Sequence, residues 1–215
     1  MQADKHRRIL DCAAEAFARF GFRKTSIADI AADARVAKGT VYLAATSKQD
    51  LFYQVLHREV REGVAAVGQL IDARKSAESL LATVLEADCQ HYDTRPLIRE
   101  LLVGEAAVAV PDQSVEFSEL RRLARSNLRD VVRLGQRQGV FRTDIEADLA
   151  AELMQDIQVA TLLFHDAPGL SEASHPRWQT TVQIFVRGLR VAASSTAIDA
   201  AAFTGCALRT QPVNP

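Results

Sequence analysis

The 215-residue sequence contains 26 lysines and arginines against 27 aspartates and glutamates, and 48% of its residues are hydrophobic. This composition is typical of one or two globular domains and excludes a disordered or fibrous chain. The uninterrupted apolar runs fall far short of the roughly 18–20 residues that a membrane-spanning helix needs, and no signal-peptide core follows the first residues. We therefore expect a soluble, cytoplasmic protein without a membrane partner.

Charge is distributed unevenly along the chain. Residues 1–61 hold 11 basic and 7 acidic side chains, a net charge of +4, which leaves 15 and 20, a net charge of −5, for residues 62–215. A basic segment joined to an acidic one suits a polyanionic partner at one end. Cys12, Cys89 and Cys206 stand far apart, so the cysteines indicate neither a disulfide framework nor a zinc site. We expect no metal and no cofactor.

Helical periodicity runs through almost every segment, and no alternating β-branched run is bounded by hairpin turns. The sequence therefore predicts an all-α fold of about nine helices. Their expected ranges are about 4–20, 25–33, 37–44, 47–70, 76–92, 96–109, 113–138, 146–166 and 174–195. The first helix should end at Gly21 in a left-handed conformation, which would fold Phe22 back on Phe17. Thr46 and Gln49 have the spacing of a capping box for the fourth helix.

Residues 27–46 have the pattern of a helix-turn-helix. Ile30 and Ala31 on the first short helix, Val36 after the turn and Val41 on the second would pack the two helices crosswise. One face of the second helix then stays exposed, and this is the helix that enters the major groove in such motifs. A solvated three-helix corner with scattered lysines is the alternative interpretation.

The side chains on and around this exposed face have the chemistry of DNA contacts. Lys38 suits a phosphate or a guanine edge, Gly39 permits close backbone approach, Thr40 offers a hydroxyl and a methyl group, and the Tyr42 hydroxyl suits a phosphate. Hydroxyls and cations at neighbouring helix starts suit the DNA backbone. The residues that we expect to contact DNA are Thr25, Ser26, Arg35, Lys38, Gly39, Thr40, Tyr42, Leu43 and Lys48.

The stretch Arg8–Ala31 and the segments Val36–Tyr42 and Ser47–Phe52 resemble the DNA-binding domain of TetR-family transcriptional regulators. The resemblance implies a homodimer whose subunits each have a three-helix head, residues 1–46, and a helical body, residues 47–197. It also implies a repressor that binds double-stranded operator DNA and leaves it when a small-molecule effector binds the body. Residues 198–215, rich in alanine and threonine, are expected to fray.

Two departures from the family pattern bear on DNA binding. Arg35 stands where the family usually has glycine in the turn, so it either adopts a left-handed conformation at a cost of about 1 kcal/mol or changes the turn. Leu43, Ala44 and Ala45 stand where the family usually has aromatic or histidine residues. A backbone contact or packing anchor is thereby lost, and operator preference can differ.

The expected body places polar side chains within its apolar helix faces. Such groups either line an effector pocket between helices or form internal ion pairs and rim positions. Two of these groups are acids, Asp88 and Glu105, and no lysine is expected to point inward. Such a pocket would suit a cationic or hydrogen-bonding effector with apolar parts. The arginines of the 113–138 helix form a separate stripe, which we interpret as an ion-paired, solvated face rather than a second nucleic-acid surface. The candidate effector residues are Asp88, His91, Tyr92, Glu105, Asn127 and Gln138.

The last two helices are apolar on more than one face, so one stripe can face the subunit core and another a partner subunit. In the family, these two helices usually pack against their symmetry mates as a four-helix bundle. The residues expected at the dimer interface are Leu153, Ile157, Phe164, Trp178, Val182, Phe185 and Leu189.

Two other functions remain as alternatives. A helical enzyme is disfavoured because no catalytic or nucleotide-binding motif is present and the five histidines lack metal-ligand spacing. The His91–Asp88 pair is more simply explained as a structural hydrogen bond than as catalytic machinery. A ligand-binding module that does not bind DNA specifically is the other alternative.

Overall fold

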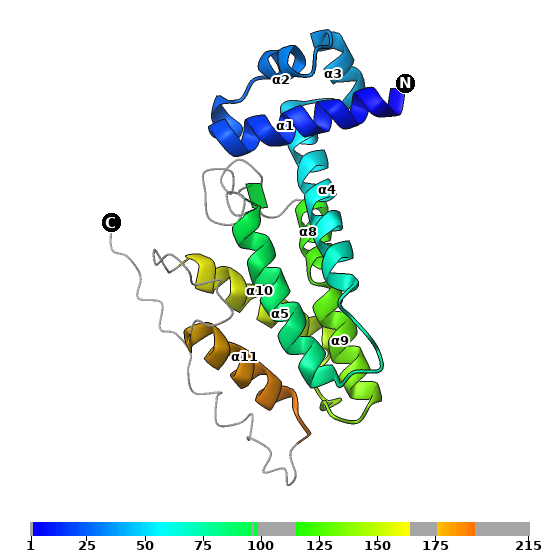
Figure 1. The fold of residues 1–215 in the computed structure, drawn as a ribbon, viewed down its shortest axis with the longest axis vertical. Coiled ribbons are helices and arrows are strands. Elements are labelled where there is room, and N and C mark those ends of the chain that lie inside the picture. Colours follow the sequence, from blue (N-terminus) through cyan, green and yellow to red (C-terminus); the bar gives the residue numbers. More distant parts are fainter. Residues whose placement is uncertain (1, 96, 99–114, 164–175, 192–215) are drawn as a thin grey trace, which may run out of the picture.

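The computed structural model describes residues 2–95, 97–98, 115–163 and 176–191 (Figure 1). Within these residues every regular element is a helix, apart from one isolated bridge between Phe141 and Arg190, as the sequence predicts. The helices are α1 (Gln2–Lys24), α2 (Ile27–Asp33), α3 (Lys38–Ala44), α4 (Lys48–Gly68), α5 (Ala77–Thr94), α8 (Val115–Ala124), α9 (Ser126–Arg137), α10 (Ala147–Leu163) and α11 (Pro176–Leu189). The expected 96–109 helix, apart from residues 97–98, and the tail 198–215 lie outside the described residues. No described helix combines the length and the apolarity needed to cross a bilayer.

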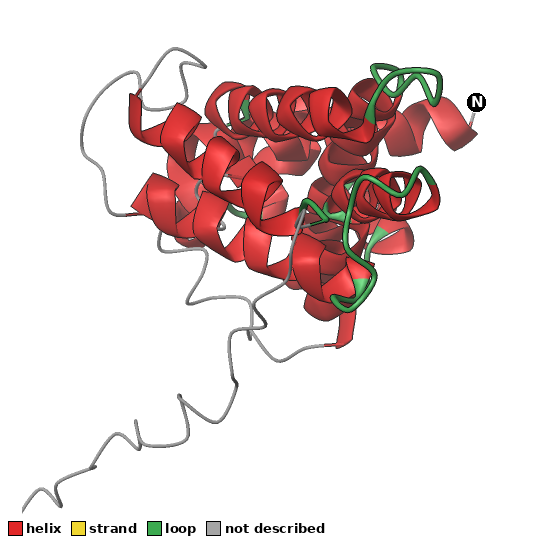
Figure 2. Ribbon diagram, turned by 90° about the horizontal axis from the view of Figure 1, so that it is seen from below, coloured by secondary structure: helices red, strands yellow, loops and turns green. Residues whose placement is uncertain are grey.

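The helices form a small head on a larger body. In Figure 1, α1, α2 and α3 lie together at one end, and α4 runs from this head into the bundle formed by α5 and α8 to α11. Figure 2, which looks at the molecule from below, shows the bundle helices side by side. Within the bundle, α5 packs on α9, α4 and α11, while α10 packs on α9. The long α4 is thus the element shared by the two parts.

The end of the first helix follows the prediction. Gly21 adopts φ 75° and ψ 164°, which interrupts the helical backbone. Phe22 then folds back, with its ring centroid 5.9 Å from that of Phe17 and 5.0 Å from that of Phe52 on α4. Because glycine adopts positive φ without a Cβ penalty, it suits this corner. The corner brings α1 against the start of α4.

The cap of α4 differs from the prediction by one residue. Ser47, not Thr46, is the N-cap, and its side chain accepts a hydrogen bond from the backbone N–H of Asp50. Thr46 instead donates through its backbone N–H and its hydroxyl to the Asp50 carboxylate, at 2.7 and 2.9 Å. The aspartate satisfies the donors that Gln49 was expected to satisfy, because a carboxylate accepts the two bonds more strongly.

The predicted helix 113–138 is wrong as a single element. The chain leaves the helical conformation at Arg125, with φ −89° and ψ 6°, so that α8 and α9 are separate helices. The two halves pack into different clusters: Leu120 of α8 joins the head cluster, whereas Leu128 of α9 joins the body cluster. The apolar pattern could not reveal the break, because it stays in phase across it. Gly139, at φ 71°, follows the end of α9.

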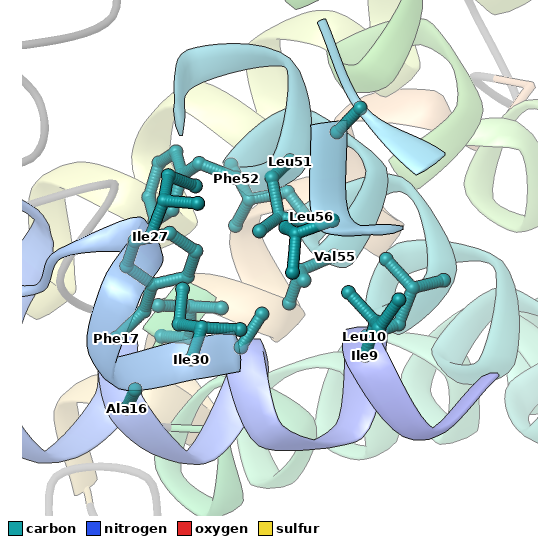
Figure 3. Packing of buried hydrophobic residues seen from close by; sticks show 14 of the residues in the cluster. Ile9, Leu10, Ala16, Phe17, Ile27, Ile30, Leu51, Phe52, Val55 and Leu56 are labelled. Atoms are coloured by element: carbon teal, nitrogen blue, oxygen red, sulfur yellow. The ribbon is translucent and has the colours of Figure 1, made fainter. Parts of the chain in front are cut away.

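The buried apolar side chains form two clusters. The head cluster joins α1, α2 and α3 to the first half of α4, as Figure 3 shows for Phe17, Ile30 and Phe52. The body cluster lies among α5, α9, α10 and α11 and includes the fully buried Trp178 and Phe141. Because α4 contributes to both clusters, a displacement of α4 in the body reaches the head through packed side chains.

Candidate DNA-binding and effector sites

Helix α3 presents the exposed face that the sequence predicts. Val41 is its only buried residue and anchors the helix on the head. Lys38, Gly39 and Tyr42 are exposed, and Leu43 is 89% exposed. The Lys38 ammonium lies 5.9 Å from the centre of the Tyr42 ring, within the range of a cation–π contact. The face therefore offers a cation, a phenol, an apolar side chain and, at Gly39, open space next to the backbone.

The turn before α3 confirms a left-handed arginine. Arg35 has φ 51° and is the only described non-glycine residue with positive φ. The turn keeps its hydrogen bonds, from Arg35 N–H to Ala32 O at 3.0 Å and from Val36 N–H to Ala31 O at 3.0 Å. The arginine therefore accepts a strained backbone without changing the turn. Its side chain is exposed, next to the face of α3.

Two other predicted DNA contacts have roles within the head. The Thr25 hydroxyl is buried and donates to Ala16 O at 3.1 Å and Gly21 O at 2.8 Å. Ser26 is the N-cap of α2 and bonds Asp29. Their contact with DNA stays a prediction, but the structure already gives both hydroxyls protein partners.

Lys48, a further predicted DNA contact, ties the start of α4 to the end of α1. Its ammonium donates to Phe22 O at 2.9 Å and to Thr25 O at 3.1 Å, with Arg23 O at 3.4 Å, and it lies 4.5 Å from the centre of the Phe22 ring. A cation at the last carbonyls of a helix is stabilising. The conformation thus uses the Lys48 charge inside the head rather than on its DNA-facing surface.

Two predicted effector residues have their polar groups satisfied by the protein. Asn127 donates to Val64 O of α4 at 2.9 Å. Gln138 accepts from the first N–H of α5, at Ala77, at 3.0 Å and donates to Lys75 O at 3.2 Å. Both side chains therefore join helices, so we leave them out of the effector site. Glu105 and the side chain of Tyr92 lie outside the described residues.

Burial shifts the pKa values of Asp88 and His91, on α5, and the two side chains form no hydrogen bond with each other. Burial raises the pKa of Asp88 to about 8, with no opposing charge or hydrogen bond from the described residues. The His91 pKa is lowered, first by burial and then by the Arg95 charge. The His91 ring packs against Gly63 of α4, where any Cβ would overlap it. The predicted Asp88–His91 hydrogen bond is wrong, because the two side chains make none with each other, and burial favours the uncharged form of each group.

Three buried polar residues escaped the sequence analysis. Gln155 and Gln158 of α10 and Trp178 of α11 are 4%, 1% and 1% exposed. Gln155 Oε1, Gln158 Oε1 and Trp178 Nε1 have no hydrogen-bond partner in the described structure. The sequence carried a signal for the glutamines, because they share a helical face with the apolar Ala151 and Met154.

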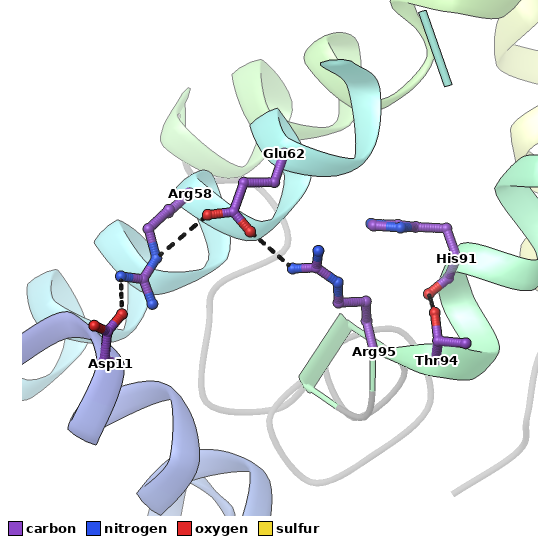
Figure 4. Close-up of polar contacts among 6 residues, drawn as sticks. All are labelled: Asp11, Arg58, Glu62, His91, Thr94 and Arg95. Carbon is purple, nitrogen blue, oxygen red and sulfur yellow. Dashed lines mark hydrogen bonds and ion pairs between the residues drawn. The ribbon is translucent and has the colours of Figure 1, made fainter. Parts of the chain in front are cut away.

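A chain of ion pairs links the head to the body (Figure 4). Asp11 of α1 pairs with Arg58 of α4 at 2.6 Å, and the same guanidinium lies 4.0 Å from Glu62. Glu62 pairs in turn with Arg95, just after α5, at 3.2 Å. The chain therefore connects the three helices α1, α4 and α5 across the junction.

The arginine stripe of α8 and α9 is ion-paired, as the sequence predicts. Its partners are the acids spaced four apart along α10: Arg121 pairs with Asp156 at 2.6 Å, and Arg133 with Asp148 at 2.8 Å. Arg125 contacts Glu152 between them, at 3.6 Å. These arginines therefore pair with α10, whereas Arg122 and Arg137 of the stripe are exposed.

The predicted dimer interface needs a correction. Trp178, Val182 and Leu189 are buried in the core of their own subunit and Phe185 packs against that core, so this stripe is not exposed to a partner. Phe164 lies outside the described residues. Leu153 and Ile157 are exposed as expected, at 50% and 42%. Helical periodicity identified both stripes of α11 but could not decide which one faces outward. The exposed large apolar side chains of the last two helices are Leu149, Leu153, Ile157, Ile184 and Val191, which we call the outer apolar face.

A helix-turn-helix head on a helical body is the architecture of a DNA-binding regulator, and the unpaired polar groups inside the body suit a small-molecule ligand. No group of three potential metal ligands lies together within the described residues. Residues 9–55 match the bacterial regulatory proteins of the tetR family, and residues 78–159 match the tetracyclin repressor-like C-terminal domain.

Individual relatives agree with these matches. Over 159 residues the chain is 30% identical to the HTH-type transcriptional repressor KstR2 of Rhodococcus jostii strain RHA1, an alignment that covers 69% of this chain and 73% of that protein. The fold is similar to FadR of Bacillus subtilis, solved with stearoyl-CoA, at a TM-score of 0.69 and 18% identity over 86% of this chain and 99% of that one. It is also similar to the ketosteroid regulator KstR2 of Mycobacterium tuberculosis, at a TM-score of 0.55 and 21% identity over 87% of this chain and 95% of that one.

The chain belongs to the TetR family of bacterial transcriptional regulators. It is a ligand-responsive, DNA-binding transcriptional repressor of that family. Proteins of this family are regulators rather than enzymes; they bind operator DNA and small effectors and form dimers.

Proposed function

We propose that the repressor reads its operator with α3, through Lys38, Gly39, Thr40, Tyr42 and Leu43, and that Arg35 adds a phosphate contact. The observation that carries this proposal is the exposed face of α3, which Val41 alone anchors from behind. Lysine and tyrosine suit phosphates, and the exposed leucine suits a thymine methyl group. Thr25, Ser26 and Lys48 act indirectly, by holding α1, α2 and α4 in the geometry that presents α3.

Two copies would be held together through the outer apolar face. Leu149, Leu153 and Ile157 follow one another at four-residue spacing on α10, and Ile184 and Val191 extend the exposed apolar surface to α11 and its end. Large apolar side chains grouped in this way are typical of a surface that associates. A two-fold dimer places two α3 helices in successive major grooves, about 34–36 Å apart.

Release from DNA follows from linkage between the two sites. An effector that prefers a body conformation with wrongly spaced heads weakens operator binding by the same factor by which the operator weakens effector binding. Helix α4 is the lever, because it packs in both apolar clusters and carries Arg58 and Glu62 of the ion-pair chain. A shift of Arg95 at the end of α5 would thereby reach Asp11 of α1.

The effector is proposed to be a lipid-like molecule that enters among α5, α10 and α11. The interior there is apolar, with a few unpaired polar groups, as ligand pockets generally are. FadR of Bacillus subtilis, a protein of similar fold, was solved with stearoyl-CoA, whose acyl chain is apolar.

The test measures binding of the protein to the DNA directly upstream of its coding sequence. Binding is measured by electrophoretic mobility shift at two salt concentrations. Lys38→Ala should weaken binding and reduce the dependence on salt by about one counterion per subunit. Gly39→Ala should fold normally, because the added methyl group meets open space, yet bind DNA more weakly because it blocks backbone approach.

Lys75→Ala is the matched control, since Lys75 is an exposed lysine of the body. If Lys38→Ala and Gly39→Ala both bind like the wild type and like Lys75→Ala, α3 is not the reading helix. If the protein does not bind the upstream DNA, sequences that it does bind are selected from a random duplex library. The absence of any selected sequence would refute operator binding.

A further inference from the structure

The interior of the body contains buried polar groups that have no hydrogen-bond partner within the described structure. Gln155, Gln158 and Trp178 are at least 96% buried, yet an amide oxygen of each glutamine and the indole N–H make no hydrogen bond within the described structure. Unpaired buried polar groups are destabilising and therefore rare in native proteins. A ligand that supplies hydrogen-bond partners would remove this cost.

These groups lie around one apolar cluster rather than scattered through the body. Gln158 Nε2 donates to Leu85 O at 3.4 Å, which places this part of α10 against α5. Gln155 lies one turn earlier on the same face of α10. Asp88 lies one turn after Leu85 and shares a helical face with the buried Leu81, in the cluster to which Trp178 of α11 belongs. Three helices thus contribute polar groups to the same interior.

The combined hydrogen-bonding capacity is neutral. The two amide oxygens accept, the indole N–H donates, and a protonated Asp88 carboxyl does both. Burial keeps Asp88 protonated near neutral pH, since its pKa is about 8. No lysine or arginine of the described residues is fully buried, although the Arg125 side chain, against Glu152 of α10, is only 14% exposed. A hydroxyl or carbonyl group would satisfy the unpaired atoms without introducing a charge.

We propose that Asp88, Gln155, Gln158 and Trp178 form the hydrogen-bonding subsite for a neutral, lipophilic effector that carries hydroxyl or carbonyl groups. The inference rests on the proposed function, since it names the chemistry of the effector that the repressor senses. The sequence predicted an effector that is either cationic or hydrogen-bonding. The subsite favours the second of these two classes. The apolar skeleton of the effector would contact the side chains of the body cluster.

The experiment uses the full-length protein and two matched sets of probes. Androstenedione is compared with androstane, which lacks its oxygens, and dodecanediol with dodecylamine and laurate, which have the same chain length but opposite charges. Thermal unfolding and operator release are measured for each probe. We expect at least one oxygenated neutral probe to raise the unfolding temperature and to displace DNA, whereas androstane, the amine and the acid have smaller effects.

The variants assign the effect to the subsite. Gln155→Leu and Trp178→Phe, which remove one hydrogen-bonding group each, should weaken binding of the neutral probe about tenfold. Asp88→Asn should retain binding, since an amide also donates and accepts, whereas Asp88→Leu should lose it. Gln90→Leu is the matched control, because Gln90 is an exposed glutamine of α5. Each variant is first shown to bind operator DNA without probe, which verifies its fold.

Several results would overturn the inference while leaving the repressor intact. One is stabilisation by dodecylamine that Asp88→Asn abolishes, which would make Asp88 a counter-ion. Others are stabilisation by laurate alone, no response to either neutral probe, or unchanged binding in Gln155→Leu and Trp178→Phe. Loss of operator binding in the wild-type protein would instead refute the proposed function, so the two failures are distinguishable.

Discussion

Replacing Asp88 by asparagine should stabilise the protein, and the gain should grow with pH. An aspartate ordinarily has a pKa of 3.8, and burial raises the pKa of Asp88 to about 8 in the folded protein because it disfavours the carboxylate. The folded state therefore binds the proton more tightly than the unfolded chain. Asp88 therefore lowers the free energy of unfolding. This loss is absent below about pH 4, grows by about 1.4 kcal/mol per pH unit as pH rises, and levels off above about pH 8.

The size of the effect follows from the same shift. At pH 7 the loss reaches about 4 kcal/mol, which is an upper bound because Asp88 keeps some contact with water. Asparagine has nearly the same shape and does not titrate, so Asp88→Asn removes the pH-dependent part and keeps an amide in the same place. The stability advantage of the variant should therefore increase by as much as about 3 kcal/mol between about pH 5 and pH 7.

Urea unfolding followed by circular dichroism measures this difference at each pH. Asp33→Asn is the control, since Asp33 is an exposed aspartate of the head, and its stability difference from the wild type should not change with pH in this way. A difference between Asp88→Asn and the wild type that stays constant from about pH 5 to pH 8 would refute the reasoning. It would mean that Asp88 is ionised in the folded protein and has a partner or full hydration.

Three further changes have expected outcomes. Arg35→Gly should raise the free energy of unfolding by about 1 kcal/mol, because φ 51° is strained for any residue with a Cβ; in urea unfolding Arg35→Ala should give no such gain, and equal stability of the two variants would contradict the explanation. Lys48→Met should lower the free energy of unfolding by about 1–3 kcal/mol, because carbonyls at the end of α1 lose a charged donor; an unchanged midpoint in thermal unfolding would show that these bonds contribute nothing. Leu153→Glu and Ile184→Glu should each yield monomers in sedimentation at micromolar concentration, whereas Leu43→Glu, at an even more exposed apolar residue of α3, should stay dimeric; dimers in all three would place the interface elsewhere.

The sequence alone determined the elements whose signals are local. Gly21 and the aromatic residue after it predicted the corner between α1 and α2, because a left-handed turn depends on a residue without Cβ and on one nearby apolar contact. The alternation of Val41 with polar neighbours predicted which face of α3 is exposed, since a seven-residue helix has one buried side. Arginines four residues apart predicted an ion-paired surface for the same reason, as helical spacing fixes which side chains line up.

Tertiary structure alone decided questions that depend on which helix lies opposite. The apolar stripes of α10 and α11 are equally visible in the sequence, but packing on α5 buries Trp178 and leaves Ile184 at the surface. Asn127 was expected to meet an effector, yet a carbonyl of α4 lies within its reach, whereas Gln155 has no such neighbour among the described residues. Periodicity specifies a face of a helix. Only the packing of helices far apart in the sequence specifies what that face meets and whether its polar atoms find partners, because those contacts join residues that no local pattern connects.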